Sequence, residues 1–387
     1  MLSKMKVLIV DDEIDICLYI KSLLETIGFE IDTASGYLEA IKFLKKNGYS
    51  ILICDQSLSE RHNHELIKWC RTVHFGYIYI ISISSNNTEQ DLLDAINNGA
   101  DEFIPKPIRA GELITRVRVG ERIMSLEKNM EETNKRFKKL YKRIKDDLIA
   151  ASVVQKSLLP KKLGIKNIKM SQLFRPAEDL SGDLYNVIHH KNKLIIYHLD
   201  TSGHGIASSF FSIMVYEAIS NAIIRENLIN PWEMIQYLNK RFIMNQQTKQ
   251  YFTIFYGVLN LKSMKLRFSQ NGQRSLIYIP YKNNPYIIDS TGPPIGLFPK
   301  IFGGESVLSL KPGDKIVLFS DGLVDSKNPN NIYFGERKIL DAFNNHNKYS
   351  LDNIFSRLLL ELEKWIGSSI FTDDVSLLGL EILKECE

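Results

Sequence analysis

The sequence has 387 residues, of which 44% are hydrophobic and 24% charged, and its formal net charge is +4. These values are typical of a globular protein with one or two domains, and so small a charge argues neither for nor against binding to nucleic acid. The four cysteines lack metal-binding spacing, and no apolar run approaches the roughly 18 residues of a membrane span. We therefore expect buried thiols, no membrane segment and a cytoplasmic location.

Residues 1–120 alternate short β-branched runs with amphipathic stretches. The runs that predict strands are KVLIV, FEIDTAS, SILICD, YIYIISIS and ADEFIPKP. Strands and helices in this rhythm indicate an α/β domain, in which helices cover both faces of a five-stranded parallel sheet. In such a doubly wound sheet, functional residues gather at the carboxyl ends of the strands.

Polar side chains follow several of these expected strands. Asp11 and Asp12 close the first strand and Asp55 closes the third, whereas Ser84 and Lys106 follow the fourth and fifth. Three crowded carboxylates are costly unless a cation neutralises them, and oxygen ligands suit Mg²⁺. An acid after a strand is more often a simple cap, but five polar residues at four strand ends favour a site.

These segments resemble the receiver domain of bacterial two-component response regulators. The matching stretches are VLIVDDE, ILICDQSL, ISISS and GADEFIPKP. The resemblance implies that a sensor histidine kinase phosphorylates Asp55, and that Asp11, Asp12, Asp55 and the Ser57 carbonyl hold Mg²⁺.

The same resemblance assigns a conformational switch to three further residues. Ser84 supplies the switch hydroxyl, Phe103 the aromatic ring that changes its packing, and Lys106 the amine that contacts the phosphate. It also implies a cis peptide bond between Lys106 and Pro107, which only an X–Pro bond adopts at low cost. The stretch SLSERHNHEL after Asp55 departs from the usual Met-Pro and Asp-Gly of the family.

Residues 121–160 show no strand pattern and predict a helical linker. Apolar residues recur mostly at three- and four-residue steps among Lys, Arg and Glu, namely at Met130, Phe137, Leu140, Ile144, Leu148 and Ala151. This stripe predicts a coiled coil and a homodimer, although a solvated charged linker is the alternative. No helix-turn-helix pattern follows, and the acids interspersed among the basic residues argue against nucleic acid as a partner.

Residues 161–387 have a different pattern. Strands are predicted at KLIIYHLD, FTIFYGVLNL, KLRFSQNG, SLIYIP, PYIID, KIVLFSDG and VSLLGLEIL. Helices are expected at residues 206–227 and 231–246. Strands in series with grouped helices favour an α+β domain, a layered β-sandwich flanked by helices.

Four acidic segments of this domain lie at turns or strand ends. They are SGDLYN with Asp183, HLDTSGHG with Asp200, LFSDGLVDS with Asp321, and FTDDVSLL with Asp373 and Asp374. Asp-Gly is also simply a good turn dipeptide. Four acidic segments together, however, are typical of a site for two divalent cations with oxygen ligands, such as Mg²⁺ or Mn²⁺.

In order and spacing, these stretches resemble the PPM family of metal-dependent serine/threonine protein phosphatases, in its bacterial sporulation and stress-response branch. The entry helix IAASVVQKSLLP and the stretch GPPIGL match as well. The resemblance implies that Asp200 bridges two Mn²⁺ or Mg²⁺ ions, with Asp183 and the Thr201 carbonyl on one, Asp321 and Asp373 on the other, and Asp374 in support.

The two resemblances together imply a response regulator whose output is a protein phosphatase. Its expected substrate is a phosphorylated protein, in this branch an anti-sigma-factor antagonist, and phosphorylation of Asp55 would control the activity. The alternative is an adaptor in which a catalytically silent phosphatase domain only binds a partner. Metal-dependent turnover of a phosphate ester would separate the two.

Overall fold

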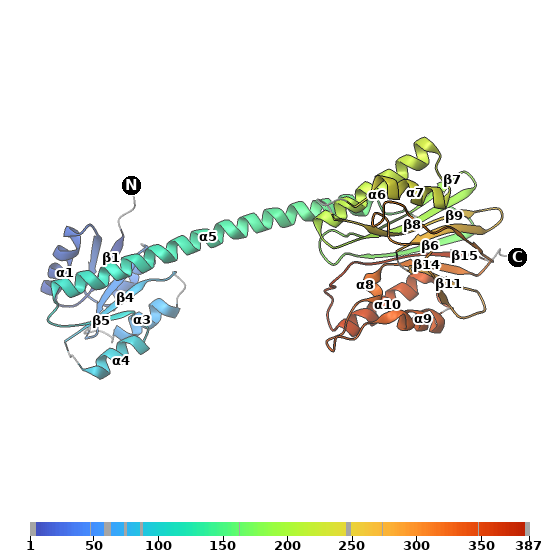
Figure 1. The fold of residues 1–387 in the computed structure, drawn as a ribbon. Helices are drawn as coiled ribbons and strands as arrows, with labels where there is room; N and C mark the ends of the chain where they lie inside the picture. The colour runs from blue at the N-terminus through green and yellow to red at the C-terminus, as the bar shows by residue number, and fades with distance from the viewer. Residues whose placement is uncertain are drawn as a thin grey trace. The chain divides into compact units, whose positions relative to one another are not determined.

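A computed structural model describes residues 5–46, 48–57, 63–72, 76–85, 88–161, 163–244, 249–272, 274–346 and 348–383. The chain divides into two compact units, Met1–Lys142 and Arg143–Glu387. The first unit has one sheet and the second has two (Figure 1), and each unit has hydrophobic cores of its own.

The first unit contains a five-stranded parallel sheet in the order β2-β1-β3-β4-β5. Its elements are β1 (Lys6–Val10), α1 (Ile14–Thr26), β2 (Glu30–Ala34), α2 (Tyr37–Lys46), β3 (Ile51–Asp55), α3 (Asn63–Thr72), β4 (Tyr79–Ser84), α4 (Glu89–Asn97) and β5 (Glu102–Pro105). All four strand pairs are parallel, so the expected α/β fold is confirmed. The carboxyl ends of β1, β3, β4 and β5 meet along one edge.

Alternation along the strands gives this sheet two apolar faces. In β1, Leu8 and Val10 join the core under α2, α3 and α4. Val7 and Ile9 join the core under α1 and the start of the next helix, α5 (Ala110–Ser157). Because successive side chains of a strand point to opposite faces, helices cover the sheet on both sides. Cys17, Cys54 and Cys70 are buried, as expected, and Cys386 lies outside the described residues.

The second unit contains two five-stranded antiparallel sheets. One has the order β13-β10-β9-β8-β7 and the other β12-β11-β14-β15-β6. The strands are β6 (Ile168–Arg175), β7 (Leu184–His190), β8 (Lys193–Thr201), β9 (Phe252–Asn260), β10 (Lys265–Asn271), β11 (Leu276–Ile279), β12 (Tyr286–Ile288), β13 (Ser306–Ser309), β14 (Lys315–Phe319) and β15 (Val375–Ile382). Of these, β6, β7 and β13 are additional to the strands predicted from sequence.

Helices cover the outer faces of both sheets, which gives four layers (Figure 1). They are α6 (Ile206–Glu226) and α7 (Pro231–Arg241) on one side, and α9 (Gly335–Asn345) and α10 (Leu351–Ile366) on the other. In β8, Leu194 and Ile196 point into the core between the sheets, while Tyr197 and Leu199 face the helices. The predicted β-sandwich flanked by helices is therefore confirmed.

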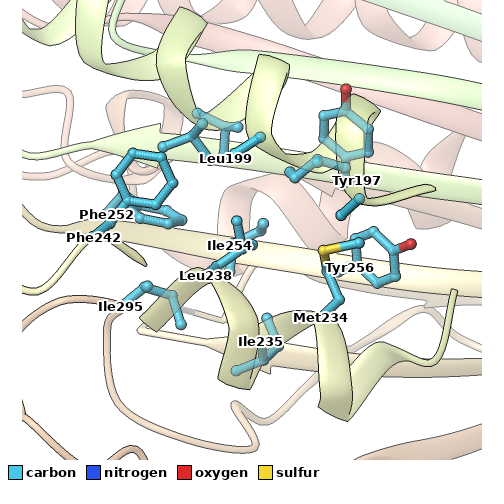
Figure 2. Close-up of a cluster of buried hydrophobic side chains, with 14 of the residues drawn as sticks. Tyr197, Leu199, Met234, Ile235, Leu238, Phe242, Phe252, Ile254, Tyr256 and Ile295 are labelled. Carbon is cyan, nitrogen blue, oxygen red and sulfur yellow. The ribbon is translucent and has the colours of Figure 1, made fainter. Parts of the chain in front are cut away.

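Helix α6 is long and apolar enough, by length and composition alone, to cross a membrane. No such segment was expected from the sequence. Half of its apolar window is buried, and residues such as Val215 and Ile219 belong to the core under α6 and α7. Figure 2 shows part of this core, where side chains of α7 lie against Leu199 and Ile254 of the sheet.

Candidate functional site

Three carboxylates meet at the carboxyl edge of the parallel sheet. Asp11 and Asp12 follow β1 and Asp55 ends β3, and each offers an oxygen within 4.8 Å of the others. Asp11 and Asp55 are buried, whereas Asp12 is exposed. Burial raises the pKa of both buried carboxyl groups, although the Lys106 ammonium beside them acts in the opposite direction.

Lys106 lies among these acids. Its Nζ is 3.2 Å from Asp11 Oδ2, 3.4 Å from Asp55 Oδ2 and 2.9 Å from Glu13 Oε1. Burial by itself would lower the pKa of this lysine, but the hydrogen bond to Glu13 and the charges of the two aspartates raise it. Lys106 is therefore a cation held at the point where three strands end.

The other switch residues predicted from sequence lie on β4 and β5. Ser84 ends β4 and is buried, and Phe103 is a buried residue of β5. The backbone amide of Ser57, in the turn after β3, donates a hydrogen bond to Asp55. The Lys106–Pro107 peptide bond is cis, as expected.

In the second unit, the predicted acids come from four different segments. Asp183 directly precedes β7, Asp200 lies near the end of β8, and Asp321 begins the short helix α8 (Asp321–Val324). Asp373 and Asp374 directly precede β15. Antiparallel pairing of β7 with β8 and of β14 with β15 brings these ends to one side of the sandwich.

Asp183 is the most deeply buried of the candidate ligands. Its Oδ2 accepts a hydrogen bond of 2.6 Å from Ser376 Oγ, whose oxygen lies 2.8 Å from His198 Nε2. Burial raises the pKa of Asp183 well above its usual value, and the Asp374 charge adds to the rise. A deprotonated Asp183 therefore requires a compensating positive charge.

Asp200 interacts electrostatically with three of the other acids. Burial raises its pKa, and the charges of Asp183, Asp321 and Asp373 raise it further. A hydrogen bond joins the carboxyl groups of Asp200 and Asp321. Burial likewise raises the pKa of Asp321, with Asp373 the next cause. Asp200 is thus electrostatically central to the cluster.

Asp374 has a structural role that differs from that of its neighbour. Its Oδ1 accepts from Ala177 N at 2.8 Å and its Oδ2 from Gly182 N at 2.6 Å. Its own amide donates to Asp373 Oδ1 at 2.8 Å. A side chain at Gly182 would approach Thr201 Oγ1 to 2.7 Å, so only glycine permits this close packing.

Both clusters suit a divalent cation. In the first unit, the three carboxylates are close, and the buried Asp55 Oδ1 has no hydrogen-bond partner within the described structure. In the second, the charges of Asp183, Asp321 and Asp373 all act on Asp200, and those of Asp374 and Asp321 act on Asp183. A carboxylate that interacts with three other acids suits a site for two ions that share one ligand.

Sequence patterns did not single out the partners of these acids. Glu13, which forms an ion pair with Lys106, is the N-cap residue of α1, and its side chain makes no capping hydrogen bond. Ser376 and His198 face Asp183 from two strands of different sheets. Another pair, His204 Nδ1 and Glu178 Oε1, lies 2.8 Å apart beside the cluster. The alternation of β15 is the signal that would have placed Ser376 on the same face as Leu378 and Leu380, between the two sheets.

Comparison with known families gives one match for each unit. Residues 7–118 match the family model for the response regulator receiver domain. Residues 190–383 match the model for stage II sporulation protein E, SpoIIE. The second match includes Asp200, Asp321 and Asp373, whereas Asp183 lies just before its first residue.

Similar proteins include two from Bacillus subtilis. The phosphoserine phosphatase RsbU is 26% identical over 189 residues, which cover 48% of this chain and 56% of RsbU. The phosphoserine phosphatase RsbP is 23% identical over 188 residues, or 47% of this chain and 46% of RsbP. The chain thus matches about half the length of these relatives.

A solved structure supports the fold of the second unit. The SiaA-PP2C domain of Pseudomonas aeruginosa aligns with a TM-score of 0.56 and 20% identity, covering 62% of this chain and 98% of that domain. In the first unit, the CpxR homolog of Haemophilus influenzae, a transcriptional regulatory protein, is 30% identical over 113 residues, which cover 29% of this chain and 48% of that protein.

Proposed function

The chain belongs to the stage II sporulation protein E family and carries a response-regulator receiver domain, and on that premise we propose that it is a response regulator that dephosphorylates phosphoserine or phosphothreonine in a protein. Residues 1–120 form the receiver, 121–160 the linker and 161–387 the phosphatase. The observation that carries the proposal is the central place of Asp200 among Asp183, Asp321 and Asp373.

In this proposal the phosphatase acids hold two Mn²⁺ or Mg²⁺ ions. Asp200 is shared, Asp183 and the Thr201 carbonyl serve one ion, Asp321 and Asp373 serve the other, and Asp374 orients the shell through Ala177 and Gly182. Bound ions of this kind lower the pKa of water and offset the charge of a phosphoryl group. The buried Ser376 hydroxyl keeps one oxygen of Asp183 fixed, so this ligand requires little reorganisation on metal binding.

In this proposal the receiver domain controls the phosphatase activity. A sensor histidine kinase phosphorylates Asp55, with Mg²⁺ held by Asp11, Asp12, Asp55 and the Ser57 carbonyl. Lys106 is already within ion-pair distance of Asp55, so it can follow the added phosphate charge. Ser84 and Phe103 then change position in response to the phosphate on Asp55.

The linker joins two copies of the chain. Helix α5 exposes apolar side chains with the three- and four-residue spacing of a coiled coil, namely Leu126, Met130, Phe137, Leu140 and Ile144. We call these five residues the seam. Each is at least 59% exposed, and pairing with a second copy would remove this apolar surface from water.

The substrate class follows from the family and its relatives. RsbU and RsbP are phosphoserine phosphatases by name, and the sporulation and stress-response branch suggests an anti-sigma-factor antagonist in the cytoplasm. The phosphatase acids lie at turns on one side of the sandwich, where a phosphorylated residue of another protein can approach.

The proposal is tested by Mn²⁺-dependent hydrolysis of p-nitrophenyl phosphate by the full chain, with and without acetyl phosphate as phosphodonor. Asp321→Asn should reduce kcat by at least about a hundredfold, because one ion loses a ligand and its charge. Asp55→Ala should hydrolyse the ester but lose the response to acetyl phosphate.

Two outcomes would contradict the proposal. Metal-independent turnover, or turnover that survives Asp321→Asn, would exclude the carboxylate site. A wild-type chain that binds a phosphorylated antagonist protein but never dephosphorylates it in Mn²⁺ would instead identify an adaptor with a silent phosphatase domain.

A further inference from the structure

Four apolar side chains are exposed on two neighbouring loops of the second unit. Ile243 and Met244 follow α7, and Phe298 and Phe302 lie in the loop between β12 and β13. Each of them is at least 40% exposed. We call these four residues the apolar patch. Exposed apolar side chains that gather in one place, unlike scattered single ones, are typical of a surface that binds another molecule.

Hydrogen bonds hold the two loops together as one surface. Met244 N donates to Gly296 O at 2.9 Å. The buried side chain of Asn239 on α7 accepts from Gly296 N at 2.9 Å and donates to Phe298 O at 3.0 Å. The ring centroids of Phe298 and Phe302 lie 6.0 Å apart. The exposed side chains of the apolar patch therefore rest on a backbone that is fixed from beneath.

The apolar patch lies close to the proposed metal site. Phe252 of β9 is the cross-strand neighbour of Thr201 in β8, and it forms a second antiparallel bridge with Ile295. Two backbone hydrogen bonds, of 3.2 Å and 2.8 Å, join Phe252 to Ile295. Ile295, which directly precedes Gly296, is thus two strand spacings, or about 10 Å, from Thr201. Because a peptide spans at most about 3.5 Å per residue, side chains a few residues from a bound phosphoserine can reach the patch.

The segments that carry the apolar patch have an excess of positive charge. Four exposed basic side chains flank it in the chain, namely Lys240, Arg241, Lys249 and Lys300. No ion pair of the described residues involves these four. The two acids of the β12–β13 loop are already paired, Asp289 with Arg274 and Glu305 with Arg267. An apolar surface with unpaired positive charge complements a partner that is apolar and acidic.

From this arrangement we propose that the apolar patch, with its basic neighbours, is the docking surface for the phosphorylated protein substrate. The partner is a protein that carries apolar and acidic side chains on the segment beside its phosphoserine. The inference rests on the proposed function and deepens it, because it assigns recognition of the substrate to a surface outside the metal site. Contacts of this kind, remote from the reacting phosphate, favour a protein over a small phosphate ester.

Two synthetic phosphoserine peptides test the proposal with the full chain in Mn²⁺. One carries leucines and glutamates within a few residues of the phosphoserine on both sides, and the other carries serines and glutamines in their place. We expect the wild type to hydrolyse the first peptide with a kcat/KM about tenfold higher, mainly through a lower KM, because exposed aromatic anchors dominate such contacts. The double variant Phe298→Ser, Phe302→Ser should lose this preference, and Lys300→Glu should reduce it.

The readout is the ratio of kcat/KM for the two peptides, so that a general loss of activity does not imitate a loss of docking. Hydrolysis of p-nitrophenyl phosphate shows that each variant is folded. Ile224→Ser is the matched control, because Ile224 is 79% exposed near the far end of α6 and should leave the ratio unchanged. If the double variant does not fold, Phe302→Ser alone decides by the same ratio.

The outcomes distinguish the docking surface from the proposed function. A wild type that hydrolyses p-nitrophenyl phosphate and both peptides equally well would overturn the inference and leave the proposed function standing. A double variant that keeps the preference would do the same, and its change from dimer to monomer in sedimentation would show that a second copy covers the patch. A chain that hydrolyses neither p-nitrophenyl phosphate nor either peptide in Mn²⁺ would overturn both.

Discussion

His198 is a buried histidine whose protonation state follows from its neighbours. Ser376 uses its single hydroxyl proton in the bond to Asp183, so His198 Nε2 must donate to Ser376 Oγ. Nδ1 is then unprotonated, and it has no hydrogen-bond partner among the described residues. Burial lowers the pKa of this imidazole to about 3, so it stays neutral in the folded protein at any physiological pH.

This neutral histidine makes the phosphatase unit sensitive to acid. Between pH 6.5 and about 3, the unfolded chain binds a proton that the folded chain does not, so the free energy of unfolding falls as the pH falls. As the pH falls from 7 to 5, His198 should lower the free energy of unfolding by about 2 kcal/mol. The measurement is calorimetric unfolding of the full chain, comparing the wild type with His198→Gln, which keeps a donor to Ser376.

The difference between the two proteins isolates His198, because the raised pKa values of Asp183 and Asp200 act with the opposite sign in both. At pH 7 and above, the difference should be constant. An equal loss of stability between pH 7 and 5 in the two proteins would show that His198 already titrates in the folded state.

At the scale of elements, the exposed seam of α5 predicts that two copies of the chain associate. Leu140 is 60% exposed in the middle of the seam, and Leu140→Glu would place a charge between two paired helices. We expect the wild type to sediment as a dimer and the variant as a monomer at micromolar concentration. The control is Lys139→Glu, which changes charge on the same helix outside the seam. A wild-type monomer at these concentrations would contradict the dimer.

Sequence periodicity predicted the elements that have one strongly apolar face. The predicted helices 206–227 and 231–246 correspond to α6, Ile206–Glu226, and α7, Pro231–Arg241. The apolar runs of β8, β9 and β15 were recognised for the same reason. By contrast, β7 mixes apolar residues with His189 and His190, and β13 has only four residues, of which Val307 is exposed. Neither strand therefore shows a clear alternation of apolar and polar residues.

The parts of the site that escaped prediction are contacts between distant segments. Acids at turns are visible in a sequence because their neighbours, such as Gly182 and Gly322, are characteristic of turns. The bond between Ser376 and Asp183 joins residues 193 positions apart, and that between Gly182 and Asp374 joins residues 192 positions apart. No local pattern specifies which serine faces which carboxylate, because sheet packing decides it.

At the scale of the whole molecule, one continuous helix links the two sites. Helix α5 begins in the receiver core with Leu113 and Val117 and ends with Gln155 bonded to the segment before Asp183. Each end is thus attached to a functional unit by buried side chains, and the exposed seam lies between them. In a dimer, a change in the receivers would alter the pairing of the seam and thereby the position of Gln155.

The rotational phase of the seam along α5 should therefore decide whether phosphorylation of the receiver changes hydrolysis at the phosphatase site. Duplicating residues 126–132 adds one heptad and changes the phase of the helix by only about 20°, whereas inserting two alanines after residue 132 rotates everything beyond it by about 200°. We expect acetyl phosphate to change p-nitrophenyl phosphate hydrolysis in the first variant as in the wild type, and to have no effect in the second. Metal-dependent hydrolysis without acetyl phosphate is the control that each phosphatase unit is folded. If both insertions respond alike, the receiver does not act through the pairing of α5.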